Sequence, residues 1–154
     1  MKKLFFFAMM LVAFTGMSLT SPITPGSGDP CLAGSQACGV FTLGKYKLDL
    51  SHGAATMEIP KAMLVESMKS GLSFAGTAEC PGTFEIVNLQ LSVDAAGDAK
   101  YTYDYELVQK MQSMEDYMLA RYFNGAEMLH FNNIQVKDSA GEIITIVTVG
   151  VVVK

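Results

Sequence analysis

The stretch FEIVNLQLSVDAAGDAKYTYDYELV, residues 84–108, holds two runs of alternating apolar and polar residues around a glycine-containing turn. In the first run the apolar positions are Val87, Leu89, Leu91 and Val93. In the second run they are Tyr101, Tyr103, Tyr105 and Leu107. Strict alternation is typical of a strand that places one face on a core. The stretch therefore predicts an antiparallel β-hairpin whose second strand reaches Leu107 and whose tyrosines point inward.

The turn of this hairpin has a second copy later in the chain, since VDAAGD at 93–98 resembles KDSAGE at 137–142. Calcium could use the acidic pairs Asp94/Asp98 and Asp138/Glu142, because it prefers several hard oxygen ligands. Each loop offers only two carboxylates four residues apart, short of a full calcium loop. Aspartate that bonds its own backbone, followed by glycine at positive φ, accounts for both loops as turns. We therefore predict two hairpin turns and no metal site.

The rest of the chain adds strands and two helices to this hairpin. In residues 41–50 the apolar phase slips by one at Gly44, which predicts a β-bulge. Helices are expected over residues 60–70, which begin with Pro60 and precede Gly71, and over 109–123. We predict an α+β fold, with about seven antiparallel strands in a hairpin-rich curved sheet and two inserted helices. The sheet would wrap the longer helix, or form a sandwich or barrel with helical plugs.

The first twenty residues predict export. Lys2 and Lys3 precede the apolar run from Leu4 to Phe14, and small residues follow, as in a bacterial secretory signal peptide. That run is too short to cross a bilayer, which takes about 20 residues. A lipoprotein is disfavoured because Gly28-Asp29-Pro30 precedes Cys31. We expect a signal peptide at 1–20, an extended lead-in at 21–30, a single domain at 31–154, and a periplasmic or extracellular location.

The charge of the chain limits the classes of macromolecule that it is expected to bind. Without Lys2 and Lys3, nine basic and fifteen acidic residues remain, a formal charge of −6. Because no stretch gathers Lys or Arg, nothing favours nucleic acid or an anionic membrane as a partner.

The chain has three cysteines, Cys31, Cys38 and Cys80, which lack the Cys-x-x-Cys spacing of a thiolate metal site. One disulfide is expected, and Cys38–Cys80 is favoured over the other two pairings because each ends a predicted strand.

Methionine is abundant in the predicted second helix, where Met111, Met114, Met118 and Tyr122 recur at helical spacing. Thioethers suit Cu(I), with His52 and His130 as further ligands, but tight Met-x-x-Met repeats are absent apart from Met111/Met114. Methionine also fills irregular gaps between helix and sheet. The methionine stripe facing the tyrosine row predicts an apolar ligand pocket, formed by Tyr101, Tyr103, Tyr105, Met111, Met114 and Met118.

No catalytic motif was found in the sequence, and we expect no enzymatic activity and no cofactor. The first functional hypothesis is an exported accessory module that binds another envelope or extracellular protein. The second is a carrier of a small apolar ligand. The third is a structural subunit that assembles through the C-terminal run IITIVTVGVV, residues 143–152, which is apolar on both faces. Such a run is either a central strand, which we favour, or an edge completed by another chain.

Overall fold

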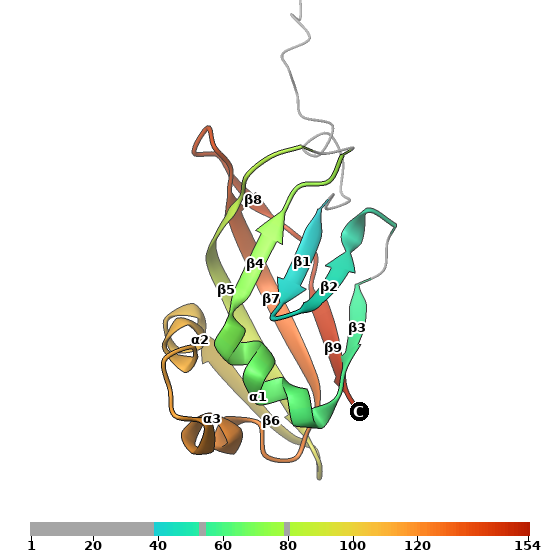
Figure 1. Ribbon diagram of the computed structural model, residues 1–154, viewed down its shortest axis with the longest axis vertical. Coiled ribbons are helices and arrows are strands. Elements are labelled where there is room, and N and C mark those ends of the chain that lie inside the picture. The colour runs from blue at the N-terminus through green and yellow to red at the C-terminus, as the bar shows by residue number, and fades with distance from the viewer. Residues whose placement is uncertain (1–38, 53–54, 79–80) are drawn as a thin grey trace, which may run out of the picture.

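The computed structural model describes residues 39–52, 55–78 and 81–154 (Figure 1). Their strands are β1 (Val40–Leu43), β2 (Tyr46–Asp49), β3 (Thr56–Ile59), β4 (Leu72–Ala75), β5 (Glu85–Ala95), β6 (Ala99–Asp104), β7 (Ala126–Lys137), β8 (Ile143–Thr145) and β9 (Val149–Val153). The helices are α1 (Lys61–Ser70), α2 (Tyr105–Met111) and α3 (Asp116–Tyr122), with a short 3₁₀ turn at Leu50–His52. The α+β class is confirmed. Nine strands and three α-helices in the described residues replace the seven and two that we predicted.

The strands form two sheets rather than one curved sheet. The small sheet has the order β2-β1-β4, and the long sheet has the order β3-β9-β7-β5-β6, with β8 paired to β7. All pairings are antiparallel except that of β3 with β9, which is parallel. This parallel pair joins segments that lie far apart in the sequence. Parallel strands are not connected by a tight turn, so a turn motif in the sequence could not predict the pairing.

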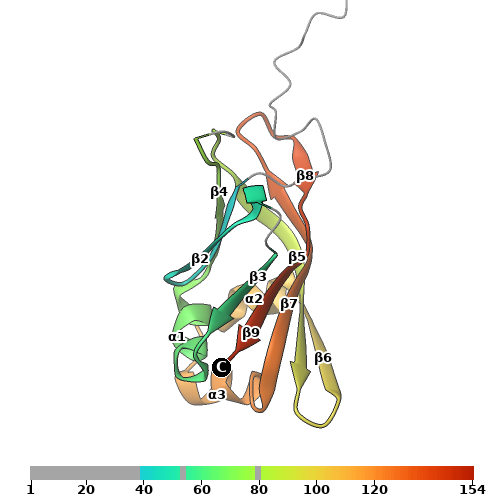
Figure 2. The ribbon, with the colours of Figure 1, turned by 90° about the vertical axis from the view of Figure 1, so that its right-hand side faces the viewer.

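The two sheets pack face to face and enclose the core between them. Figure 2 shows the small sheet and the three helices on one side of the long sheet, which we call its inner face. Phe41 of β1 meets Phe131 of β7 with ring centroids 5.3 Å apart, and both side chains are fully buried. Tilted aromatic pairs at this separation stabilise a core beyond the area that they bury.

Gly44 forms a hairpin turn and not the predicted bulge. The register pairs Leu43 with Tyr46, which leaves Gly44 and Lys45 as a two-residue loop. Gly44 has φ 59°, and a Cβ there would lie 2.8 Å from the backbone of Ser67 in α1. Glycine is therefore required at this position for two reasons, its positive φ and the close approach of the turn to the helix. The turn reverses the chain between two strands, which is why the apolar phase slips.

The predicted first strand of the central hairpin is confirmed as β5, with a change of face at its start. Leu89, Leu91 and Val93 are buried, but the next inward residue is Ile86 rather than Val87. The pairing with β7 shifts between Ile86 and Asn88, so Val87 is an extra residue there. A bulge of this kind exchanges the faces of all residues beyond it.

The first helix matches its prediction, whereas the second is broken. Helix α1 follows Pro60, and Gly71 ends it with φ 88°. The predicted helix over 109–123 is replaced by α2 and α3, which are separated by residues 112–115. Asp116, at the start of α3, binds the Lys69 ammonium of α1 at 2.5 Å, and Leu119 of the same helix is buried in the core.

The second strand of the hairpin ends earlier than predicted. Its alternating pattern runs to Leu107, but β6 stops at Asp104 and Tyr105 opens α2. The Asp104 carboxylate accepts a hydrogen bond from the Leu107 backbone amide at 2.9 Å. Aspartate is among the best N-cap residues because it satisfies an amide that has no partner within the helix. The cap therefore overrides the strand pattern.

The apolar C-terminal run divides into two strands. Strand β9 pairs with β3 on one side and with β7 on the other, and Val149 and Val151 are fully buried. This part of the run is the central strand that we favoured, because both of its sides are paired within the described part of the chain. Among the described strands, β8 pairs only with β7, and its first residue, Ile143, is 58% exposed.

Several predictions fall outside the described residues. These are the signal peptide at 1–20, the lead-in at 21–30, and the three cysteines Cys31, Cys38 and Cys80. Among the helices that the structure describes, none combines the length and the apolar character needed to span a membrane.

Candidate functional site

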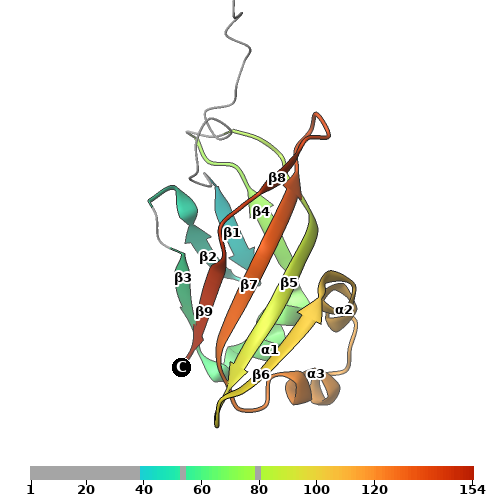
Figure 3. The same ribbon diagram turned by 180° about the vertical axis from the view of Figure 1, so that it is seen from behind.

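The candidate site is a pocket between the edge strand β6 and helix α3. It has a volume of about 420 Å³ and is lined by Tyr101, Tyr103, Met118, Arg121, Tyr122 and Asn124. We call these six residues the tyrosine patch. Strand β6 is the last strand of the long sheet, and Figure 3 shows it at the sheet margin with α3 beside it. The site is therefore positioned by the end of the sheet and by a helix that covers its inner face.

Strand register explains why the tyrosines face this pocket. Tyr101 pairs with Val93, and Tyr103 pairs with Leu91. Directly paired residues share a face of the sheet, and both β5 partners are fully buried on the inner face. Tyr101 and Tyr103 therefore point to the inner side, as predicted. Core does not cover them completely, because they lie at the margin, and Tyr101 remains 50% exposed.

Helix α3 supplies the opposite wall. Its buried residue Leu119 anchors it in the core, and this leaves Met118, Arg121 and Tyr122 around the pocket. The Tyr122 ring stands edge-on to Tyr103, with centroids 5.4 Å apart and an interplanar angle of 79°. This aromatic contact closes the inner end of the pocket, while Met118 is 41% exposed at its rim.

The polar groups that line the pocket are the Arg121 guanidinium, which is a cation, and the neutral side chains of the tyrosines and Asn124. Burial, with smaller contributions from the neighbouring Tyr101 and Tyr122, raises the pKa of Tyr103. Its hydroxyl therefore stays protonated at neutral pH and can donate a hydrogen bond. Within the described parts of the chain, the Arg121 guanidinium has neither an ion pair nor a hydrogen bond. An arginine beside aromatic rings favours a carboxylate or a further aromatic ring as ligand.

Of the six residues predicted to line a pocket, the structure brings three together: Tyr101, Tyr103 and Met118. The other three lie elsewhere. The Tyr105 hydroxyl donates to the Ile86 carbonyl at 2.6 Å, and burial raises its pKa. Met111 is fully buried in the core, and Met114 packs against the core between α2 and α3. These three separate from the patch because the strand ends at Asp104 and the helix is broken.

Arg121, Tyr122 and Asn124 were not among the predicted pocket residues. A signal for the helix break was available in Ser113-Met114-Glu115-Asp116, which has the Ser-x-x-acid form of a helix start. The observed helix begins two residues later, after Glu115. Arg121 and Tyr122 follow Met118 by three and four residues, so any helix over this segment places them on the same side as Met118. Tyr122 already belonged to the methionine stripe, and the helical spacing was therefore the signal that could have added both residues to the predicted pocket.

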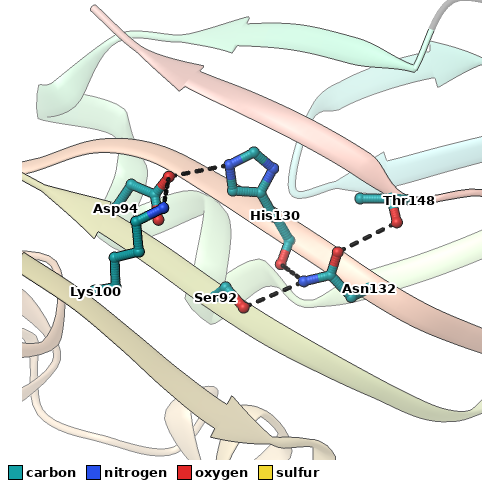
Figure 4. Close-up of polar contacts among 6 residues, drawn as sticks. All are labelled: Ser92, Asp94, Lys100, His130, Asn132 and Thr148. Carbon is teal, nitrogen blue, oxygen red and sulfur yellow. Dashed lines mark hydrogen bonds and ion pairs between the residues drawn. The ribbon is translucent and has the colours of Figure 1, made fainter.

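A second group of polar side chains lies on the outer face of the long sheet (Figure 4). Asp94 Oδ2 lies 3.3 Å from His130 Nε2 and 3.7 Å from Lys100 Nζ. Asn132 donates to the Ser92 hydroxyl at 3.2 Å and accepts from the Thr148 hydroxyl at 3.2 Å. Ser92, His130 and Asp94 resemble a catalytic triad in composition. The Ser92 hydroxyl, however, bonds to Asn132 and not to His130, so the contact between nucleophile and base is missing.

The two predicted turns differ in how they use aspartate. Asp138 Oδ1 accepts the backbone amides of Ala140 and Glu142 at 2.9 and 2.8 Å, and Gly141 has φ 88°, as predicted for a turn. In the other loop, Asp94 points to the sheet face, while Gly97 and Asp98 provide the positive φ values. Over the residues that the structure describes, no three His, Cys, Asp or Glu side chains gather closely enough to hold a metal ion.

A further hollow of about 430 Å³ lies between α1 and α3. Of its three charged residues, Lys69 and Asp116 bind one another, which raises the pKa of Lys69, and Glu66 is the third. The hollow has no aromatic side chain in its lining, unlike the tyrosine patch. The chain matches no protein family model, and a search of curated proteins found no relative.

Proposed function

We propose that this protein is an exported, non-catalytic module that binds protein through the tyrosine patch. The main support is that Tyr101 and Met118 are exposed beside Arg121, whose guanidinium has no partner in the described residues. Tyrosine, methionine and arginine are enriched at protein interfaces, and tyrosine and arginine contribute most often to binding energy. Tyr117, on the same short helix, adds a side chain that is 70% exposed.

The location of the patch supports the same proposal. The patch lies between the end of a sheet and α3, a helix of seven residues. These elements leave an open surface, which suits a side chain of another protein better than an enclosed small molecule. Export is part of the proposal and is supported by the sequence of residues 1–20. An acidic chain with no basic cluster also favours a protein partner over nucleic acid.

The test is site-specific photo-crosslinking followed by binding measurements. A photoreactive residue at Tyr101 should crosslink to a discrete protein in the cells that produce the chain. The same residue at Ile143, which is also exposed but lies on β8, is the matched control. With the captured protein purified, Tyr101→Ala or Arg121→Ala should weaken binding at least about tenfold. Equal binding by these variants and by Ile143→Ala would refute the proposal.

A second function, carriage of a small ligand, is favoured by the pocket volume of about 420 Å³. This lies within the range of about 300–1,000 Å³ that ligand sites occupy. The ligand would need an apolar body for Met118 and the tyrosines and an acidic group for Arg121. Native mass spectrometry of gently purified protein distinguishes the two functions, because a carrier retains a small added mass that Met118→Ala removes.

A further inference from the structure

Strand β6 exposes the longest edge in the two sheets. Among the strands that the structure describes, it pairs only with β5. It contains six residues, whereas the other sheet margins β2, β3 and β4 contain four each. An exposed edge presents backbone amides and carbonyls that another strand can pair with. The tyrosine patch lies directly beneath this edge, so a strand added to β6 would place its inward side chains over α3.

The side chains of β6 form a self-complementary series. If a second β6 lies antiparallel with Thr102 opposite Thr102, then Tyr101 lies opposite Tyr103, and Lys100 lies opposite Asp104. Each of these two pairings occurs twice, as a two-fold axis requires. Opposite charges and paired aromatic residues are both favourable across antiparallel strands. In this register each lysine lies opposite an aspartate, and each tyrosine lies opposite another tyrosine.

The faces of β6 agree with this register. Lys100, Thr102 and Asp104 pair with Asp94, Ser92 and Gln90 on the outer face of the long sheet. The Lys100 side chain is 74% exposed and has only a 3.7 Å contact with Asp94. Asp104 uses Oδ1 to cap α2, which leaves Oδ2 for a lysine of another chain. Both charges are therefore accessible on the face where they would meet.

We infer that the tyrosine patch takes a second copy of this chain, with β6 pairing antiparallel to β6 so that two long sheets join. The inference rests on the proposed function and names the partner of the same surface. Tyr101 and Tyr103 of each copy would cover the patch of the other, including Met118 and Arg121. Of the other edges, β8 has three uncharged residues, Ile143, Ile144 and Thr145, and offers no matching of charges. Strand β2 has one lysine and one aspartate, Lys47 and Asp49, but is two residues shorter than β6, and the tyrosine patch does not border it.

The experiment measures the dimerisation constant by sedimentation equilibrium over a wide concentration range. In Lys100→Glu, glutamate faces Asp104 twice, and dimerisation should weaken at least about tenfold. The double variant Lys100→Glu/Asp104→Lys restores opposite charges. Because it also removes the N-cap of α2, it is compared with Asp104→Lys alone, in which lysine faces lysine, and should dimerise more tightly than either single variant. Lys47→Glu, on the exposed margin of β2, is the matched control and should dimerise like the natural chain. Circular dichroism verifies that each variant is folded.

The outcomes separate the two proposals. Loss in Lys100→Glu together with recovery in the double variant supports the β6 pairing. A dimer that is insensitive to both variants uses another surface and overturns the inference. A chain that stays monomeric also overturns it, and photo-crosslinking at Tyr101 then decides the proposed function separately. A crosslink to a different protein retains that function, and the absence of any crosslink rejects it as well.

Discussion

The two ends of the long sheet are covered in different ways. In the view of Figure 1, the small sheet covers the upper part of the inner face, and α1, α2 and α3 cover the lower part. Under the small sheet, Phe41 and Phe131 are fully buried. At the lower margin, Tyr101 and Met118 remain exposed beside a pocket. A sheet covers a sheet continuously, whereas short helices leave gaps at the edge, and the candidate site occupies such a gap.

The comparison is tested most strongly by removing one buried side chain from each end. Phe131→Ala should lower the free energy of unfolding by about 3–5 kcal/mol, because two packed sheets cannot close around the cavity. Leu119→Ala, in α3, should cost about 2 kcal/mol, since a short helix beside an open pocket can shift inward. Chemical denaturation measures both values. Equal losses would show that the helical end is packed as rigidly as the sandwiched end.

The two related turns provide a smaller test, one at each end. Asp138→Ala removes the acceptor of two backbone amides and should cost about 1 kcal/mol of unfolding free energy. Asp94→Ala removes the 3.7 Å ion pair with the exposed Lys100 and the 3.3 Å contact with His130, and it should cost about 0.5 kcal/mol or less. Thermal denaturation of the two variants gives the order. The reverse order would mean that the outer-face network, and not the turn, carries the larger stabilisation.

The smallest effect concerns the pH dependence of the tyrosines. Burial raises the pKa of Tyr103 and of Tyr105 in the folded protein, above the ordinary value of about 10. A raised pKa means that their contribution to stability is complete below pH of about 10 and is lost as the pH rises through the folded value. Alkaline titration of tyrosinate absorbance should show late-ionising groups. Tyr103→Phe should remove one of them, and an unchanged curve would contradict the burial of Tyr103.

Much of the local structure could be predicted from short patterns. The alternation in 84–94 predicted β5, Pro60 and Gly71 delimited α1, and Asp138 with Gly141 predicted a turn that the hydrogen bonds confirm. Each depends on the conformational preferences of a few adjacent residues. Half of the predicted pocket residues also surround the observed pocket, because strand register alone placed Tyr101 and Tyr103 on the inner face.

Errors arose where two local signals competed. At Asp104 the alternation predicted continued strand, but the helix cap prevailed. Between Met111 and Met118 the periodicity predicted one helix, whereas α2 ends at Met111 and a separate helix, α3, begins at Asp116 and packs on the core through Leu119. The break separated Met111 and Met114 from Met118, which alone of the three methionines lines the pocket. A pattern within one segment does not report which other segment will pack against it.

The sequence by itself determined the α+β class, the positions of most strands and the chemistry available at the surface, because these follow from residue type and spacing. Tertiary structure alone decided that the strands form two sheets, that β3 joins β9 in parallel, and that β6 is a margin. These features depend on contacts between residues far apart in the chain, and the free energy of such contacts is shared among many positions. The site combines both levels, since its residues come from local patterns and its opening comes from the end of the sheet.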